Sequence, residues 1–339
     1  MNILLHTRFY PKVGGIETVA WLLAHEWYRL GETVTVVSDV ACSLVQRRDF
    51  PFQVYYRPNP VQWLRLMRSA DVFVHFNVSL RALWPLLVVR RPFVATHHGF
   101  YFVNRAGDQD WRERLKLRVA RRAAANIAVS QAVARVIGVS CDIIPNPFDP
   151  TLFHTNGAAL QSRELAFVGR LVSDKGADLL LKSLGILNSR GLRPQLTVIG
   201  GGPERPLLEQ LVHEMQLEGQ VTFVGAKSQR EVAEMLRAHH VLVVPSLVRE
   251  GFGVVALEGI ASGCAVVGSE GGGLPEAIGL CGLTFPNGDA NALAEKLAQL
   301  LTNDRLVRNL LSGAEAHLSR HHPTLVANRY LDVIKQVAA

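Results

Sequence analysis

Short apolar runs alternate with longer segments of helical period along most of the chain. In the first part, apolar runs occupy 2–7, 33–38, 71–76, 92–97, 126–130 and 142–145, and segments of helical period lie at 15–30, 79–90 and 110–124. Runs that are apolar on both faces are typical of strands buried in a parallel sheet, and the helical segments between them predict βαβ units. The first part is therefore predicted to be a doubly wound α/β domain with helices on both faces of its sheet.

A break at 146–163 separates this domain from a second one. The break is rich in turn-forming residues and has no sustained period, so it is interpreted as a linker. The same rhythm then restarts, with apolar runs at 164–169, 196–201, 221–225, 241–246 and 265–269 and helical segments at 175–190, 204–217, 229–239, 289–301 and 304–320. We therefore predict an N-terminal domain at 1–145 and a second Rossmann-like domain at 164–322. The final segment, 323–339, is predicted to be an amphipathic helix that packs back on the N-terminal domain.

The composition agrees with two globular domains. The 339 residues are 48% hydrophobic and 19% charged, which excludes a disordered or fibrous chain. The four cysteines, at 42, 141, 264 and 281, form no C-x-x-C pair and no zinc-ligand spacing, so a reducing compartment is expected. The N-terminus lacks the pattern of a signal peptide, and the longest apolar run, 82–89, is interrupted by Pro85. A cytoplasmic protein without a membrane span is therefore expected.

The positive charge is concentrated in the N-terminal half. Residues 1–145 hold 19 Lys and Arg against 10 Asp and Glu, a net +9, whereas the rest of the chain holds 17 against 19, a net −2. The densest basic stretch, 111–122, also contains Trp111 and three other apolar residues. It is interpreted either as a solvated helix or as a peripheral contact with an anionic membrane surface. A nucleic-acid contact is disfavoured because no nucleic-acid-binding module accompanies it.

The most informative stretch is 244–278, in which Glu250 and Glu258 flank a Gly-Phe-Gly turn. An apolar strand precedes the turn and an apolar run follows it, so a helix is predicted to begin within 251–255. The start of a helix offers unpaired backbone N–H groups and the positive end of its dipole, which together suit a diphosphate. Eight helical residues would span about 12 Å, comparable to the reach from the ribose of a nucleotide sugar to its hexose. The plainer alternative is that Glu250 caps the helix and Glu258 lies on its solvated face.

At this point the chain resembles the family 4 retaining glycosyltransferases of the GT-B fold, whose signature PS…EGFG…E has seven residues between the two glutamates. Other motifs that are similar to those of the family occur in order at 10–24, 146–153, 167–181 and 272–278. One such motif would be weak support, but five in the family's order cover nearly the whole chain. The resemblance implies two Rossmann-like, doubly wound α/β domains that face each other across a cleft.

The resemblance also implies a donor site in the second domain. Glu258 would accept hydrogen bonds from the ribose hydroxyls and Glu250 from the donor sugar. Arg170 and Lys175 would neutralise the two phosphates, because breaking a glycosyl–phosphate bond leaves a diphosphate whose growing charge must be stabilised. A solvated surface pair is the alternative for these two cations.

Further site residues follow from the same resemblance. Gly15, which comes after Gly14, would present its N–H to the donor diphosphate, because glycine allows a close approach of the backbone. His98 would lie near the anomeric carbon, with His97 as the alternative. The loop at 225–231 would meet the base. The remaining implied substrate-binding residues are Lys227, Gly251, Phe252, Gly253, Val254 and Val255.

The implied activity is transfer of a hexose from a nucleotide sugar, UDP-glucose in the first instance, to a saccharide or lipid-linked acceptor on the basic N-terminal domain. It would belong to polysaccharide or glycoconjugate synthesis. Retention would need no covalently bound protein nucleophile, because the departing diphosphate helps to take the acceptor proton, while a double displacement stays open. The alternatives are a sugar-nucleotide epimerase of GT-B fold and a catalytically silent sugar-nucleotide-binding protein. No cofactor and no nucleic-acid partner are expected.

Several other patterns are interpreted as decoys. Asp108-Gln109-Asp110 matches the D-x-D of metal-dependent GT-A enzymes, but no apolar strand delivers it, so it is predicted to be a loop and no metal is expected. Ser130 and Ser246 lack the G-x-S-x-G elbow of hydrolases. The absence of a full G-x-G-x-x-G fingerprint disfavours a nicotinamide dehydrogenase. His321 and His322 are predicted to be solvated.

Overall fold

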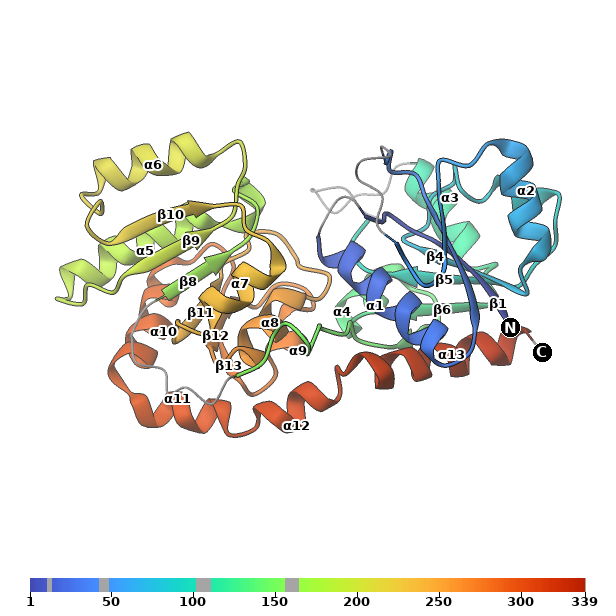
Figure 1. Ribbon diagram of the computed structural model, residues 1–339. Coiled ribbons are helices and arrows are strands. Elements are labelled where there is room, and N and C mark those ends of the chain that lie inside the picture. The colour runs from blue at the N-terminus through green and yellow to red at the C-terminus, as the bar shows by residue number, and fades with distance from the viewer. Residues whose placement is uncertain (11–13, 43–48, 102–110, 156–164, 339) are drawn as a thin grey trace. The chain divides into compact units, whose positions relative to one another are not determined.

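A computed structural model describes residues 1–10, 14–42, 49–101, 111–155 and 165–338. The chain forms two compact units, one of Met1–Pro147 with His321–Ala339 and the other of Phe148–Arg320 (Figure 1). The predicted linker, 146–163, therefore starts at the boundary between the units, and its later residues lie outside the described ranges. No helix in the described ranges is long and apolar enough to cross a membrane.

The described part of the first unit contains a seven-stranded sheet in which every paired strand is parallel. In spatial order its strands are β3 (Gln53–Tyr56), β2 (Thr33–Ser38), β1 (Asn2–His6), β4 (Val72–Phe76), β5 (Phe93–His97), β6 (Ala125–Ala128) and β7 (Asp142–Ile143). The order reverses between β1 and β4, so this pair of strands is the topological switch point of the first sheet. The central strands β4 and β5 are buried along their whole length, as the apolar runs at 71–76 and 92–97 predict.

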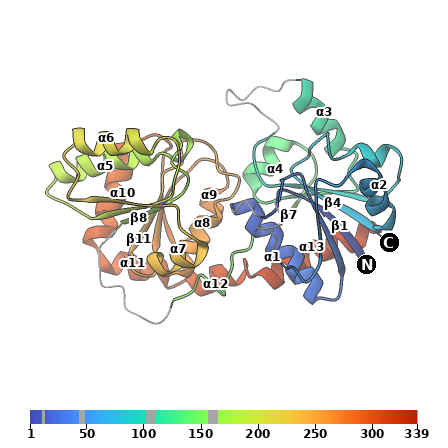
Figure 2. The same ribbon diagram turned by 45° about the horizontal axis from the view of Figure 1, so that its top comes forward.

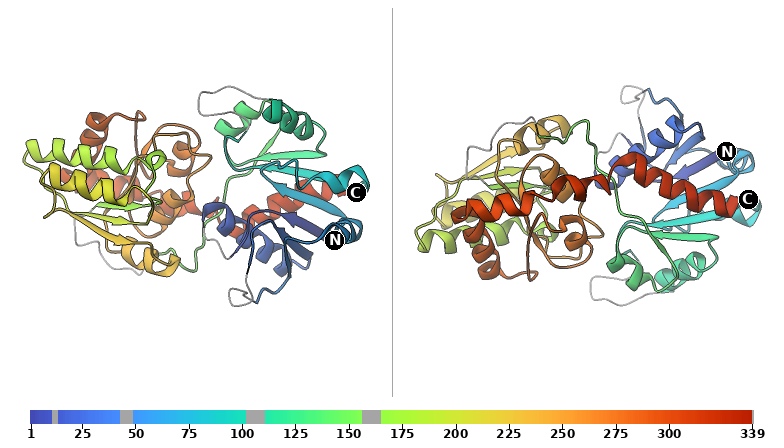
Figure 3. Two further views of the ribbon diagram at one scale, coloured as in Figure 1. Left: turned by 90° about the horizontal axis from the view of Figure 1, so that it is seen from above. Right: turned by 90° about the horizontal axis from the view of Figure 1, so that it is seen from below.

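The helices of the first unit are α1 (Gly15–Arg29), α2 (Pro60–Ser69), α3 (Trp111–Ala120), α4 (Gln131–Ile137), α13 (Pro323–Ala338) and the short 3-10 turn η2 (Trp84–Leu87). The last of the α-helices, α13, runs beside α1 (Figure 3). The Trp27 indole donates to the Ala327 carbonyl at 3.2 Å, and the Thr324 hydroxyl donates to Glu26 at 2.7 Å. The Trp27 and Tyr330 rings are fully buried against each other. The final helix thus completes the core of the first unit.

The second unit repeats the doubly wound topology. Its strands, all parallel, are in spatial order β10 (Val221–Gly225), β9 (Leu196–Ile199), β8 (Leu165–Val168), β11 (Val241–Val244), β12 (Ala265–Ser269) and β13 (Gly282–Phe285). Its helices are η3 (Ser173–Lys175), α5 (Ala177–Ser189), α6 (Arg205–Glu214), α7 (Gln229–Leu236), α8 (Val254–Ala261), α9 (Leu274–Ile278), α10 (Ala290–Thr302), α11 (Asp304–Leu311) and α12 (Ala314–Ser319). In Figure 2, α5, α6 and α10 cover one face of the sheet and α7 lies on the other. The switch point of this sheet lies between β8 and β11.

Two predicted elements differ from the structure. The segment 79–90 forms only the 3-10 turn η2, because Pro85 supplies no backbone N–H for a longer helix. The predicted helix at 304–320 is divided into α11 and α12 at Ser312 and Gly313. The helix after the Gly-Phe-Gly turn begins at Val254, within the predicted range, and Gly253, at φ +97, is its N-cap.

Candidate donor site at the switch point of the second sheet

The segments that follow β8 and β11, together with α8, carry most of the predicted site residues. β8 leads toward β9 and β10 on one side, and β11 leads toward β12 and β13 on the other. In an open parallel sheet, ligands bind beyond the carboxyl ends of the strands at such a reversal. Arg170 and Lys175 follow β8, and Glu250 and the start of α8 follow β11. The chain order of these residues therefore brings them to one edge of the second unit.

Lys175 and Glu250 form the closest charged pair of this edge. The Lys175 ammonium donates to Glu250 Oε1 at 2.5 Å, and the buried Ser246 hydroxyl donates to the same oxygen at 2.6 Å. Gly176, at φ +66, makes the approach possible, because a Cβ there would lie 2.0 Å from the Pro245 carbonyl oxygen. Both donors meet on Oε1, and Oε2 of Glu250 has no partner in the described residues. This oxygen remains available to a sugar hydroxyl.

The backbone around Glu250 is fixed by the glycines at 271–273. Glu250 forms a parallel β-bridge with Gly272, and its carbonyl accepts from the Gly273 N–H at 2.8 Å. Gly272 has φ +85, and a Cβ at this position would lie 2.2 Å from the Glu250 carbonyl oxygen. Only glycine fits this contact without strain. The glycines of this loop therefore serve packing on Glu250.

α8 starts within the predicted range, after a turn. Gly251, Phe252 and Gly253 form the turn before the helix, and Phe252 is buried. The helix supplies its unpaired N–H groups from Val254 and Val255 onward. Because the residues from Glu250 to Gly253 are not helical, the span of about 12 Å that assumed helix throughout does not describe this segment.

Glu258 lies in α8 one turn after Val254. Its side chain retains some exposure, but burial of the carboxyl group, followed by the nearby charge of Asp149, raises its pKa to about 7. Asp149 is itself buried and accepts from both the N–H and the hydroxyl of Thr151. Glu258 is therefore a carboxyl group poised to change its charge near neutral pH.

The remaining predicted residues of the second unit differ in their surroundings. Arg170 is exposed and has no side-chain partner in the described ranges, so its guanidinium can move to an anion. Lys227 is also exposed and lies 3.2 Å from Glu231 of α7. Two residues that sequence reasoning missed hold the loop of Glu250. One is Ser246, and the other is Asn287, whose amide donates to the Ser246 carbonyl at 2.9 Å.

In the first unit, Gly14 and Gly15 lie at the start of α1, directly after a segment outside the described residues. A Cβ at Gly15 would meet nothing within 4 Å, whereas one at Gly14 would lie 2.7 Å from a Glu17 carboxylate oxygen. The other Glu17 oxygen is 3.6 Å from Arg8. An anion at Gly15 would thus share the helix start with the carboxylate of Glu17.

Both histidines at the end of β5 are buried and neutral. Burial lowers the pKa of His97 to about 4 and that of His98 to about 3. The His97 ring contacts Tyr101 at 2.6 Å and Asn126 at 2.9 Å, and the His98 ring contacts Thr96 at 3.0 Å and Asn146 at 3.2 Å. The ring nitrogens of both side chains are therefore engaged within the first unit.

The structure describes the histidine pair and Ser130, which are interpreted as decoys, but not the D-x-D pattern. His322 is exposed as predicted, but the prediction for His321 is wrong, because it is buried and its ring nitrogen lies 3.1 Å from the Asn146 carbonyl oxygen. Ser130 caps the start of α4. The D-x-D at 108–110 lies outside the described residues. Within the described ranges, no group of three or more His, Cys, Asp or Glu side chains is arranged to hold a metal ion.

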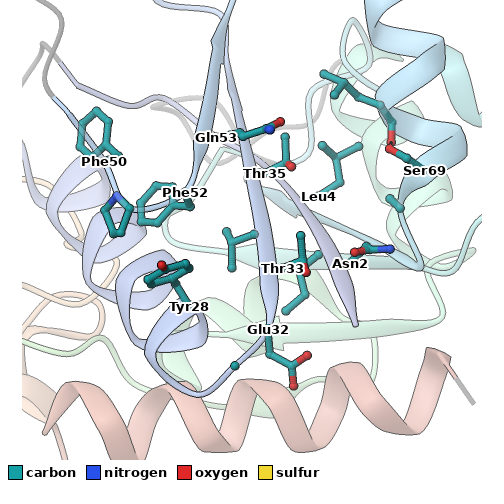
Figure 4. A pocket seen from close by; sticks show the side chains of 16 residues that line it. Asn2, Leu4, Tyr28, Glu32, Thr33, Thr35, Phe50, Phe52, Gln53 and Ser69 are labelled. Carbon is teal, nitrogen blue, oxygen red and sulfur yellow. Dashed lines mark hydrogen bonds between the residues drawn. The ribbon is translucent and has the colours of Figure 1, made fainter.

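A pocket of about 800 Å³ lies at the opposite edge of the first sheet (Figure 4). Asn2, Thr33 and Gln53, which begin β1, β2 and β3, line it together with Tyr28 and Ser69. No predicted site residue lines this pocket. The amino ends of parallel strands are not where such sheets hold their ligands, so this pocket is not the donor site.

Comparison with known proteins identifies the family. The model described as "Glycosyltransferase Family 4" matches residues 13–152, and the model "Glycosyl transferases group 1" matches residues 149–317. The phosphatidyl-myo-inositol mannosyltransferase of Mycobacterium leprae is 30% identical over 280 residues, which is 77% of this chain and 72% of that protein. The chain belongs to glycosyltransferase family 4. The motifs that carry the resemblance in the sequence thus indicate the correct family.

Other relatives of this family 4 chain match over shorter stretches. The D-inositol 3-phosphate glycosyltransferase of Saccharomonospora viridis is 33% identical over 186 residues, which is 52% of this chain and 43% of that protein. The corresponding protein of Corynebacterium glutamicum is 35% identical over 156 residues, 44% of this chain and 37% of that protein. The chain spans less than half of the length of these two relatives.

Solved structures establish the fold of this family 4 chain. Anabaena HepE, crystallised with UDP, has a TM-score of 0.83 at 19% identity and covers 99% of this chain and 100% of its own. WaaG, a glycosyltransferase involved in lipopolysaccharide biosynthesis, has a TM-score of 0.73 at 18% identity, with 98% of this chain and 99% of its own covered. The prediction of two Rossmann-like units of the GT-B fold is confirmed.

Proposed function

We propose that this chain transfers a hexose from a UDP-linked sugar, with UDP-glucose as the first candidate, to a saccharide or lipid-linked acceptor with retention of configuration. The observation that carries the proposal is the meeting of Lys175, Ser246 and Glu250 at the switch point of the second sheet, beside the start of α8. The HepE crystal structures that contain UDP, and UDP-glucose, support a uridine donor.

Each side chain of this edge has a role in the proposal. The exposed Arg170 moves onto one phosphate, and Lys175 shifts from Glu250 toward the other. The unpartnered Oε2 of Glu250 accepts from a donor hydroxyl, and ionised Glu258 accepts from the ribose hydroxyls. The N–H groups of Val254 and Val255 stabilise the diphosphate as it departs.

Retention proceeds in the proposal without a covalent protein nucleophile. The departing diphosphate takes the acceptor proton, and Arg170, Lys175 and the start of α8 stabilise its charge. His98 is neutral at pH 7 because burial lowers its pKa to about 3, so it contacts the donor as a neutral group. No metal ion takes part, since the cationic side chains and the helix start supply the positive charge.

The acceptor binds to the basic first unit in this proposal. One relative is named a D-inositol 3-phosphate glycosyltransferase, and another is named a phosphatidyl-myo-inositol mannosyltransferase. An inositol-containing acceptor is therefore a candidate beside a saccharide, and all of these share a ring of hydroxyl groups. A lipid-linked acceptor would bring the exposed basic face of α3 to a membrane surface.

Titration calorimetry with UDP, GDP, UDP-glucose and GDP-mannose, followed by incubation with the radiolabelled donor, tests the proposal. We expect UDP and UDP-glucose to bind and label to be transferred to a polyol or saccharide acceptor, or slowly to water. An epimerised nucleotide sugar would identify the epimerase instead, and tight binding without turnover would identify a silent binding protein. Binding of none of the four ligands would overturn the proposal.

A further inference from the structure

A second group of titratable side chains lies at the carboxyl edge of the first sheet, outside the donor site. His6 ends β1 and His75 lies in β4, the two strands that form the switch point of this sheet. Both histidines are buried, at 4% and 1% exposure, whereas the side chain of Asp39, which follows β2, is 60% exposed. The three groups connect the interior of the first unit to its surface.

The contacts of the His75 ring fix the position of its proton. The Ser79 N–H donates to His75 Nε2 at 2.8 Å, so this nitrogen carries no proton. Burial holds the pKa of His75 well below its ordinary value, so the ring is neutral and its proton is on Nδ1. His75 Nδ1 lies 3.3 Å from the His6 carbonyl oxygen and 3.0 Å from His6 Nδ1. His6 Nε2 in turn lies 3.4 Å from an oxygen of Asp39, so the His6 ring connects His75 to the carboxylate.

Hydrogen bonds also hold the main chain around Asp39. The Ser38 hydroxyl oxygen accepts from the N–H groups of Phe9 and Val40, and Arg57 Nε donates to the Asp39 carbonyl at 2.9 Å. The contact with His6 lowers the pKa of Asp39, partial burial raises it, and the charge of Arg81 lowers it further, with a net shift downward. Asp39 is therefore an ionised carboxylate with one oxygen beside His6, and its other oxygen has no partner in the described residues.

Stability does not account for this arrangement. An exposed ion pair contributes only about 0–1 kcal/mol to folding stability. Burying two imidazole rings lowers stability unless every ring nitrogen has a hydrogen-bond partner. Two non-glycine residues at the same edge have left-handed backbones, Arg57 at φ +46 and Asn77 at φ +55. Strained residues of this kind gather at functional sites. This edge therefore combines buried ring nitrogens, an exposed carboxylate and two left-handed residues.

We propose that Asp39 binds the ring hydroxyls of the acceptor and that His6 and His75 position its carboxylate. The inference rests on the proposed function, in which the acceptor lies on the first unit. A carboxylate with one oxygen held from inside the protein presents the other to a diol, as ionised carboxylates do in polyol sites. The exposed Arg57 and Arg81 beside it suit an acceptor that also carries a phosphate.

The first test is a histidine-selective ¹⁵N NMR experiment on the full chain. We expect His75 to be neutral and protonated on Nδ1 at pH 7. myo-Inositol, D-inositol 3-phosphate and glucose are then titrated, and at least one is expected to shift the His6 signals. The phosphorylated and unphosphorylated probes separate the contribution of the arginines from that of Asp39. Probes that leave the His6 signals unmoved, or a His75 ring protonated on Nε2, overturn the inference.

Variants separate this site from the donor site. Asp39→Ala is expected to weaken probe binding roughly tenfold, the effect of losing a charged hydrogen-bond partner, and to leave UDP affinity within about twofold. Asp71→Asn removes the same charge at the opposite edge of the sheet and is expected to change neither. His75→Gln is expected to shift the His6 signals of the free protein and to weaken probe binding. Equal probe binding by wild type and Asp39→Ala overturns the inference. A wild-type protein that does not bind UDP overturns the proposed function itself.

Discussion

The charged residues of the proposed donor site are not equivalent, because each has different surroundings in the absence of ligand. Arg170 has no side-chain partner in the described ranges, Lys175 is paired with Glu250, and Glu258 lies near Asp149 with a raised pKa. In the proposal, a ligand therefore exchanges the Lys175–Glu250 ion pair and binds the ionised form of Glu258, while it gains Arg170 without competition. These differences make separate predictions for each side chain.

Replacing the donor-site residues one at a time is expected to weaken UDP binding. Arg170→Ala, Lys175→Ala and Glu258→Ala each remove a charged hydrogen-bond partner, worth roughly 1.5–3 kcal/mol or about tenfold to a hundredfold in affinity. Lys182→Ala is the matched control, because Lys182 is exposed and paired only with Asp178 on α5. Calorimetry that returned wild-type UDP affinity for all three site variants would remove the assignment.

UDP affinity is expected to rise with pH through the pKa of Glu258. Because burial raises this pKa to about 7, the carboxyl group is mostly protonated at pH 6 and mostly ionised at pH 8. If ribose binding requires the carboxylate, affinity should increase about tenfold over this range. Glu258→Gln should remove that part of the increase, and comparing the two proteins cancels titration of the UDP phosphates.

The raised pKa of Glu258 affects stability in the opposite direction to UDP affinity. The folded protein binds this proton more tightly than the unfolded chain, whose glutamate has an ordinary pKa. The free energy of unfolding should therefore fall as pH rises from about 4.5 to 7. Denaturant titrations of wild type and Glu258→Gln measure this term, and parallel pH profiles for the two proteins would show that Glu258 titrates normally.

At the scale of elements, apolar periodicity locates the buried parts of the fold better than its contacts between loops. The predicted helix at 15–30 is observed at Gly15–Arg29, because a regular apolar face packs on the sheet and on α13. Ser246 and Asn287 could not be recognised, since their shared contact joins loops 41 residues apart. His321 was predicted wrongly for the same reason, because its partner, Asn146, is 175 residues away.

The glycine contact with Glu250 provides a test at this scale. Gly272→Ala places a Cβ against the Glu250 carbonyl oxygen and should displace the loop, with a loss of UDP-glucose affinity of at least about tenfold. Gly191→Ala has the same kind of backbone, at φ +78, but nothing lies within 4 Å of the added atom. Both variants should lose about 1–2 kcal/mol of stability from backbone strain. Equal UDP-glucose affinity in the two would show that the contact is not needed.

The positive charge of the molecule lies in residues 1–145, at a net +9 against −2 for the rest, and α3 carries several exposed arginines of this part. Trp111 is 67% exposed and Leu115 is 37% exposed, between arginines that also face solvent. Lys116 instead turns toward Tyr101, with its ammonium 5.7 Å from the ring centroid. The solvated side of α3 thus combines arginines with an exposed indole, which suits the surface of an anionic bilayer.

We expect the protein to cosediment with vesicles that contain anionic lipid and much less with neutral ones. Each basic residue near such a surface contributes about 1 kcal/mol, and the attraction should weaken with salt. Changing Arg114, Arg118 and Arg121 to Gln should therefore reduce binding roughly a hundredfold. The same change at Arg193, Arg305 and Arg308 of the second unit is the control. Equal binding to both vesicle types would leave a soluble saccharide as the better acceptor.

Activity is expected to survive EDTA, because Arg170, Lys175 and the start of α8 are proposed to neutralise the diphosphate. Asp108→Ala and Asp110→Ala should be nearly silent in the same radiolabel assay. Loss of activity in EDTA that Mn²⁺ or Mg²⁺ restores would show that the D-x-D, or another group, binds a catalytic metal.

The return of α13 to the first unit determines when that unit can finish folding during synthesis. The Trp27 indole cannot donate to the Ala327 carbonyl until the ribosome has added Ala327, 300 residues later. At about 5–20 residues per second, this delay is roughly 15–60 s. Throughout it, the apolar surface under α13 stays exposed on the nascent chain, while the second unit emerges with all of its own partners. The unit whose synthesis begins first is thus completed last. Its exposed apolar surface is the one that a chaperone would bind during synthesis.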